Sequence, residues 1–168
     1  MKILPIRIFP DPVLRAECDL VTRFDAALST FVNTLWNTMK QQPGGIGIAA
    51  PQIGISKQIA IVDLTKKQTA TSPIFMINPK ILASAVSRNC VVREGCMSLP
   101  DFTANVIRSE TVTIEYLNLA GETIRHHAVG LEAICVQHEI DHLNGQLFVD
   151  RVSSLKGDVF RRKRYLKE

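Results

Sequence analysis

The stretch CVQHEIDHLNG, residues 135–145, carries two histidines four positions apart with a glutamate between them. The apolar periodicity of residues 131–143 is that of a helix. In a helix, His138 and His142 would lie on one face, about 6 Å apart along the axis, so both imidazoles could bind one metal ion. Glu139 would project about 100° around the axis, where a general base for a bound water belongs. The pattern predicts a helical metal site of a hydrolase.

A catalytic metal of this kind usually has a third protein ligand, and the residues after the helix offer no convincing one. Metzincin proteases would place a third histidine at the position of Phe148, so that class is excluded. The acids downstream are only Asp150, Asp158 and Glu168. Cys135 shares the histidine face, but it lies about 7.5 Å along the axis from the midpoint of the histidines, too far for a short side chain.

Cys96 is the better candidate for the third ligand. It lies in REGCMSLP, residues 93–100, where the flanking glycine and proline favour a tight, non-helical turn. Such a turn can bring a thiolate and backbone N–H groups to the same point. Cys18 and Cys90 are expected to be buried free thiols, since the chain has no CxxC pair and no secretory signal.

The remaining pattern predicts an α+β fold, with antiparallel β-sheets packed around a central helix that carries the HExxH motif, plus N-terminal and C-terminal helices. The 168 residues fit a single catalytic domain over 1–168. We expect a helix over 24–42, strands over 58–64 and 73–79, a hairpin over 111–129, and a basic C-terminal helix over 155–168.

The net charge of +4 lies entirely in the segment 155–168, which has six basic and two acidic side chains. This charge fits either a solvated helix end or contact with nucleic acid or another acidic surface. No apolar run approaches the roughly 18–20 residues of a membrane span. We therefore expect no membrane partner. The free cysteines and the lack of a secretory signal predict a cytoplasmic location of bacterial type, and an organellar origin stays open as the alternative.

Three motifs together resemble the peptide deformylase family. GIGIAAPQ at 45–52 is similar to the family's GxGLAAxQ, EGCMSLP at 94–100 to EGCLSxP, and QHEIDHLNG at 137–145 to QHExDHLxG. PDPVLR at 10–15 and INP at 77–79 extend the match. The resemblance implies a hydrolase that removes the formyl group from the N-terminal formyl-methionine of newly synthesised chains and releases formate.

The resemblance also implies roles for individual residues. Glu139 would be the general acid and base while a metal-bound water attacks the formyl carbon. The side-chain amide of Gln52 and the backbone N–H of Met97 would stabilise the oxyanion. One divalent ion is implied, with Fe²⁺ native and Zn²⁺, Ni²⁺ or Co²⁺ as substitutes. The implied metal ligands are Cys96, His138 and His142.

A pocket for the methionine side chain is a further implication of the resemblance. Gly47 would hydrogen-bond the substrate main chain, as an added strand does. The apolar members of the set could equally be plain core residues. The expected substrate-binding residues are Ile46, Gly47, Val92, Glu94, Gly95, Leu131, Ile134 and Cys135.

Other residues receive structural roles. Asp141 is expected to form an ion pair, with Arg108 as the partner that the resemblance suggests. His126 and His127 lie in a strand without metal spacing and are expected to be structural. The resemblance further implies formyl-methionyl nascent peptides as substrates and a ribosome contact through the basic tail. We also expect a monomer.

Two other functions remain to be weighed against a deformylase. A zinc endopeptidase would cleave internal peptide bonds, but the cysteine ligand and the missing downstream glutamate argue against it. A catalytically inactive, ribosome-associated homologue is disfavoured by the intact ligands, glutamate and glutamine.

Overall fold

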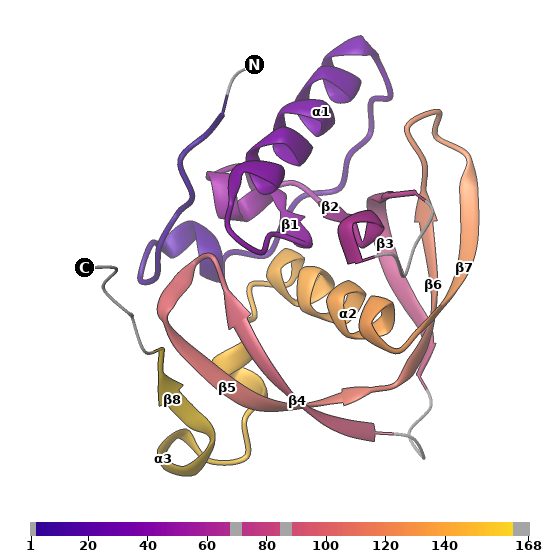
Figure 1. The fold of residues 1–168 in the computed structure, drawn as a ribbon. Helices are drawn as coiled ribbons and strands as arrows, with labels where there is room; N and C mark the ends of the chain where they lie inside the picture. Colours follow the sequence, from indigo (N-terminus) through magenta and orange to yellow (C-terminus); the bar gives the residue numbers. More distant parts are fainter. Residues whose placement is uncertain (1–2, 68–71, 85–88, 163–168) are drawn as a thin grey trace.

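The computed structural model describes residues 3–67, 72–84 and 89–162. Two antiparallel sheets enclose one central helix, α2 (Leu131–Leu143), and a second long helix, α1 (Ala26–Gln41), lies beyond the first sheet (Figure 1). This arrangement confirms the predicted α+β fold with the HExxH helix at its centre. Among the described residues, no helix is long and apolar enough to cross a membrane.

The larger sheet separates the two helices. Strand β2 is buried on both faces, and its side chains alternate between two cores. Ile59 and Ile61 pack with the apolar face of α1, whereas Ala60 and Val62 pack with that of α2. In spatial order the strands of this sheet are β1 (Gly47–Ala49), β2 (Ile59–Val62), β3 (Ile74–Ser84), β6 (Thr111–Leu117) and β7 (Thr123–Val129).

The local patterns of the sequence predicted several of these elements well. Helix α1 falls inside the predicted 24–42, and its N-terminus is capped by Asp25, whose carboxylate accepts the Leu28 N–H at 3.0 Å. The hairpin of β6 and β7 pairs Thr111 with Val129, as expected from the alternation over 111–129. Strand β3 was expected to end at 79 but continues to Ser84, because a bulge accommodates the proline at that position.

The second sheet was largely missed from the sequence. Its strands, in order, are β4 (Asn89–Cys96), β5 (Leu99–Ser109) and β8 (Val159–Arg161). Met97 and Ser98 form the predicted tight turn, and this turn closes a long hairpin of β4 and β5. The hairpin runs beside α2 (Figure 1), and Cys96 is the last residue of β4.

The predicted C-terminal helix over 155–168 is wrong for the described part of that segment. Only one turn, α3 (Leu155–Asp158), is helical, and β8 then pairs antiparallel with the outer edge of β5. A helix this short has little intrinsic stability, whereas β8 satisfies the free backbone groups of β5. Residues 163–168 lie outside the described residues. The short 3₁₀ helices are η1 (Pro12–Arg15), η2 (Ala50–Ile53), η3 (Thr65–Lys67) and η4 (Phe148–Arg151).

Candidate active site

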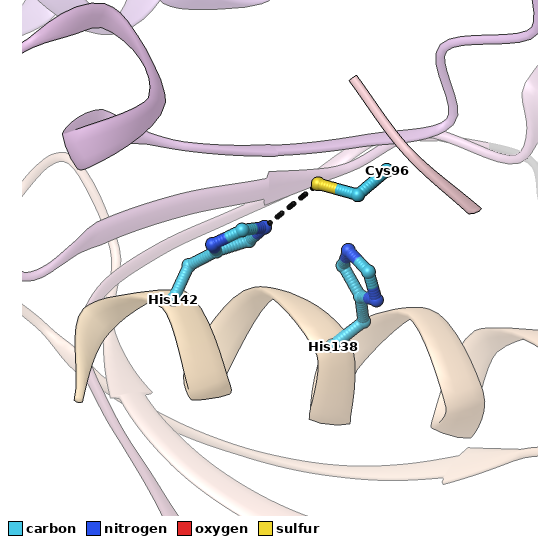
Figure 2. A group of neighbouring side chains, drawn as sticks. All are labelled: Cys96, His138 and His142. Carbon is cyan, nitrogen blue, oxygen red and sulfur yellow. Dashed lines mark hydrogen bonds between the residues drawn. The ribbon is translucent and has the colours of Figure 1, made fainter. Parts of the chain in front are cut away.

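Three side chains converge between helix α2 and the end of β4. The candidate ligand atoms of Cys96, His138 and His142 all lie within 4.8 Å of one another. Figure 2 shows the two imidazoles rising from α2 toward the cysteine, whose Sγ is 3.2 Å from Nε2 of His142. Metal–sulfur bonds of about 2.3 Å and metal–nitrogen bonds of about 2.0 Å fit a group of this size. The residues predicted as ligands are therefore placed to hold one ion.

A buried chain of charges orients one of these histidines. Nδ1 of His138 lies 2.8 Å from Glu94, which leaves Nε2 for a metal. Arg108 donates to Glu94 from Nε at 2.7 Å and to Asp141 from Nη1 at 2.6 Å. The expected ion pair of Arg108 and Asp141 is confirmed, and Arg151 donates to the same carboxylate at 2.6 Å. Glu94, Arg108 and Asp141 are at most 7 % exposed, so these buried ion pairs support the orientation of His138.

The electrostatic surroundings favour charged ligands. Burial alone would raise the pKa of Cys96, but His142 and His138 bring it well below its ordinary value, which favours a thiolate. Burial also opposes the charged form of Glu94, yet His138 and Arg108 lower its pKa to about 2. Strongly perturbed groups of this kind gather at functional sites.

Glu139 lies beside the ligand group and is buried at 4 % exposure. Burial raises the pKa of its carboxyl to about 7, although His138 and His142 favour the charged form. Among the described residues, neither Oε2 of Glu139 nor Nδ1 of His142 has a hydrogen-bond partner. A side chain at Gly47 would overlap Oε1 of Glu139, so this strand approaches the carboxylate only because it carries a glycine. The unsatisfied buried oxygen of Glu139 beside the ligands fits a site built for a metal ion and a reacting molecule.

Gln52 presents its amide nitrogen to the same space. Its Oε1 accepts the Ala49 N–H at 2.9 Å, which fixes the direction of the amide. Nε2 lies 3.4 Å from Sγ of Cys96 and 3.3 Å from Oγ of Ser98. A donor held in this way can stabilise a negative charge that develops next to the metal group.

A cavity of about 220 Å³ opens beside these groups. All eight residues expected to bind substrate line it, together with Gln52, Met97, His138 and Glu139. Three lining residues were missed: Gly44, Gly45 and Arg93. Gly44 and Arg93 directly precede the first and second motifs, and Gly45 is the first residue of the first motif, so only their position in or next to the motifs could have indicated them.

Residues assigned structural roles lie outside this cavity. His126 Nε2 is 2.5 Å from Glu132, and His127 Nδ1 is 3.1 Å from Oγ1 of Thr113. Phe148, at the position where a metzincin ligand would stand, stacks on His138 with ring centroids 6.4 Å apart. Cys18 is buried as expected, but the prediction for Cys90 is wrong in part, because it is only half-buried on a strand at the edge of its sheet.

Comparison with known proteins agrees with this site. The polypeptide deformylase family model matches residues 3–158. The peptide deformylases of Rhizobium meliloti (strain 1021) and Brucella suis biovar 1 are 44% and 42% identical over 163 residues, which is 97% of this chain and 92% of each relative.

Solved structures are similar as well. Peptide deformylase from Thermotoga maritima has a TM-score of 0.85 at 37% identity and covers 92% of this chain and 100% of its own. The enzyme from Synechococcus elongatus, solved with actinonin, has a TM-score of 0.84 at 40% identity and covers 91% of this chain and 80% of its own. The chain belongs to the polypeptide deformylase family of hydrolytic enzymes.

Proposed function

We propose that this enzyme hydrolyses the N-formyl group of formyl-methionyl nascent peptides with one divalent metal held by Cys96, His138 and His142. The observation that carries the proposal is the convergence of these ligand atoms with Glu139 and Gln52 beside a largely apolar cavity. The membership of the family supports the substrate class.

The donor set suits a particular group of metals. One thiolate and two imidazoles favour iron or zinc over calcium or magnesium. We propose Fe²⁺ as the native ion, with Zn²⁺, Ni²⁺ or Co²⁺ as substitutes. When bound, such an ion acts as a Lewis acid and lowers the pKa of a water molecule toward neutrality.

The protein residues then divide the work of proton transfer and charge stabilisation. Glu139 takes a proton from the attacking water and returns it to the leaving amine, which releases formate. The Gln52 amide and the Met97 N–H donate hydrogen bonds to the oxygen of the tetrahedral intermediate. The carboxylate of Glu94 is occupied by His138 and Arg108, so we assign it a positioning role rather than a direct contact with the peptide.

The cavity is suited to one apolar side chain and an extended backbone. Ile46, Val92, Leu131 and Ile134 line a space for the methionine. Gly47 lies in β1, the outermost strand of its sheet, where an extended peptide can add as a further strand. We propose that the chain works as a cytoplasmic monomer of one domain and that its basic C-terminal tail contacts the ribosome.

The proposal is tested by formate release from formyl-Met-Ala-Ser under anaerobic conditions. Substitution Glu139→Gln should lower kcat by about 100-fold or more, because the proton acceptor is lost, while the metal content stays at one ion per chain. Glu132→Gln is the matched control on the same helix, since Glu132 contacts His126 outside the cavity.

Assays with the same purified enzyme, on formylated and on unformylated peptides, separate the competing functions. Cleavage of internal bonds in an unformylated peptide would identify an endopeptidase. A metal-loaded chain that releases no formate would identify an inactive homologue. Undiminished turnover in Glu139→Gln would overturn the proposed mechanism.

A further inference from the structure

Ser98 carries a buried hydroxyl that the proposed mechanism does not use. It lies in the turn between β4 and β5, directly after Met97, and it is 0 % exposed. Its Oγ lies 3.3 Å from Nε2 of Gln52, the amide nitrogen proposed to stabilise the oxyanion. Gln52 and Met97 both line the substrate cavity, whereas Ser98 lies outside its lining. Any effect of the Ser98 hydroxyl on the reaction must therefore pass through its neighbours.

The side-chain amide of Gln52 is held at both of its ends. Its Oε1 accepts the Ala49 N–H at 2.9 Å, which fixes one end but still allows the plane of the amide to turn about that contact. The other end, Nε2, carries two N–H groups. Oγ of Ser98 accepts one of them, and the other is then directed toward Sγ of Cys96, 3.4 Å away. Together these contacts fix the plane of the amide and aim one N–H at the group of metal ligands.

The backbones of Gln52 and Ser98 are held by the N-terminal segment. The Arg7 N–H donates to the Gln52 carbonyl at 2.7 Å. Two residues later, the Phe9 N–H donates to the Ser98 carbonyl at 2.9 Å. Because both backbones are fixed, the direction of the Nε2 hydrogens depends on the side-chain torsions of Gln52. The Ser98 hydroxyl restrains those torsions.

The same hydroxyl joins the two proposed donors to the oxyanion. Gln52 lies in η2, whereas the Met97 N–H belongs to the turn that also carries Ser98. Donors of this kind are effective when they are aimed in advance at the place where negative charge develops. Hydrogen bonds from residues behind a site keep such a geometry precise.

We propose that Ser98 is a positioning residue, whose hydroxyl aims the Gln52 amide at the oxyanion and sets its place relative to the Met97 N–H. This inference rests on the proposed deformylase function and adds a residue that does not touch the substrate. Without the hydroxyl, the amide can turn about its contact with Ala49, so fewer enzyme molecules hold a competent donor. Ser98→Ala should lower kcat by about 5- to 30-fold, less than removal of the amide itself, and should leave KM within about 2-fold.

A double-mutant cycle with formyl-Met-Ala-Ser as substrate tests this inference. Ser98→Ala is measured alone and together with Gln52→Leu, and the metal content and melting temperature are determined for each variant. In the Gln52→Leu background, Ser98→Ala should change kcat by less than about 2-fold, because the group that Ser98 positions is gone.

Thr38→Val is the matched control for the loss of a buried hydroxyl. Thr38 is also 0 % exposed, and its Oγ1 accepts the Leu4 N–H at 3.2 Å. It lies on α1, on the other side of the larger sheet from the site. This variant should lower the melting temperature and leave kcat unchanged.

A second measurement does not depend on turnover. In ¹⁵N-labelled, zinc-loaded protein, the side-chain amide signal of Gln52 is identified by its loss in Gln52→Leu. Ser98→Ala should shift this signal and speed its hydrogen exchange, since one N–H loses its acceptor.

An unchanged kcat in Ser98→Ala, or an equal loss of kcat with and without the Gln52 amide, would overturn the inference. A loss in Thr38→Val as large as that in Ser98→Ala would also overturn it, by showing that general destabilisation lowers turnover. An unaltered Gln52 signal in Ser98→Ala would show that the hydroxyl does not hold the amide. In each of these cases, formate release by the unmodified enzyme leaves the proposed function standing, and absence of that release would remove the proposed function itself.

Discussion

Cys96 and Cys135 line the same cavity, but their surroundings shift the pKa values of the two thiols in opposite directions. The imidazoles beside Cys96 outweigh its burial and lower its pKa, whereas burial, aided by Glu139, raises the pKa of Cys135 to about 12. One thiol is thus prepared to lose its proton to a metal ion, and the other stays neutral at physiological pH. This difference explains why Cys135, which lies on the same helix as the two histidines, can border the site without competing with Cys96 for the ion.

The metal content of two alanine variants checks this distinction. Cys96→Ala removes one of the three ligand atoms and should abolish stoichiometric metal binding. Cys135→Ala removes only a small side chain from the cavity wall and should keep one ion per chain. Elemental analysis of anaerobically purified protein is the measurement, and equal metal loss in both variants would contradict the assignment.

Removal of the Gln52 amide should affect turnover more than substrate binding. In Gln52→Leu, the donor to the developing oxyanion is lost, so kcat should fall about 100- to 1,000-fold while KM changes little. The Ala49 N–H also loses its acceptor, and the free energy of unfolding should drop by about 1–3 kcal/mol. Steady-state kinetics at a temperature well below the transition separate these effects. A raised KM with normal kcat would assign Gln52 to ground-state binding instead.

At the scale of elements, the end of α2 depends on one glycine. Gly145 has a φ of +68°, and a side chain there would meet the carbonyl of Arg15. This close approach joins α2 to η1 and so fixes the end of the helix that carries both histidines. Only glycine meets both requirements, the backbone conformation and the space.

The matched comparison is Gly145→Ala against Gly44→Ala. Gly44 has a similar φ of +72° but open space around it. Gly44→Ala should cost about 1 kcal/mol of unfolding free energy from backbone strain alone, and Gly145→Ala clearly more because of the overlap. Urea unfolding measures both values, and equal costs would show that the contact with Arg15 relaxes freely.

Elements with a local signal could be predicted from the sequence, and those without one could not. Helix α2 and the hairpin of β6 and β7 each contain their own periodicity, so their bounds follow from neighbouring residues. The sequence of β4 lacks a clear strand pattern, because several of its residues serve the site at the end of the strand. Strand β8 exists only because the edge of β5 is free more than fifty residues earlier. The local sequence of residues 155–168 therefore led to the incorrect prediction of a helix.

The same distinction applies to the candidate site. Its metal ligands, Glu139 and Gln52 could be named from motifs, because their chemistry demands fixed residue types. Gly44 and Arg93 could not, because they lie outside the motifs and only the folded chain places them beside the cavity. The orientation of His138 by Glu94 is likewise visible only in the folded chain.

At the scale of the whole molecule, Asp63 connects α1 to the larger sheet. Its carboxylate accepts hydrogen bonds from Trp36 Nε1 at 2.8 Å and from the Thr65 hydroxyl at 2.6 Å. Burial opposes the charged form, yet these bonds lower the pKa of Asp63 below its ordinary value. A lowered folded-state pKa means that the stabilisation is complete above the unfolded value and is lost as the pH falls through the folded one.

The stability advantage of the native protein over Asp63→Asn should therefore be larger at about pH 7 than at about pH 3, since unfolded aspartate titrates near 3.9. Urea unfolding followed by fluorescence reports it directly, because Trp36 is the single tryptophan of the chain. A stability advantage over Asp63→Asn that grows as the pH falls would mean that folding raises the pKa of Asp63, which would contradict this prediction.

The buried charges of Glu94, Arg108 and Asp141 limit the order in which substitutions at these positions can accumulate during evolution. Loss of Arg108 leaves the buried Glu94 without its guanidinium partner, and breaking a buried ion pair in this way costs about 3–5 kcal/mol, which approaches the stability of an ordinary domain. Tolerated changes at these positions must arrive together or after a stabilising change elsewhere. In a saturation library, the three positions should be strongly epistatic, and the deformylase would reach any alternative support for His138 only through a narrow set of mutational paths.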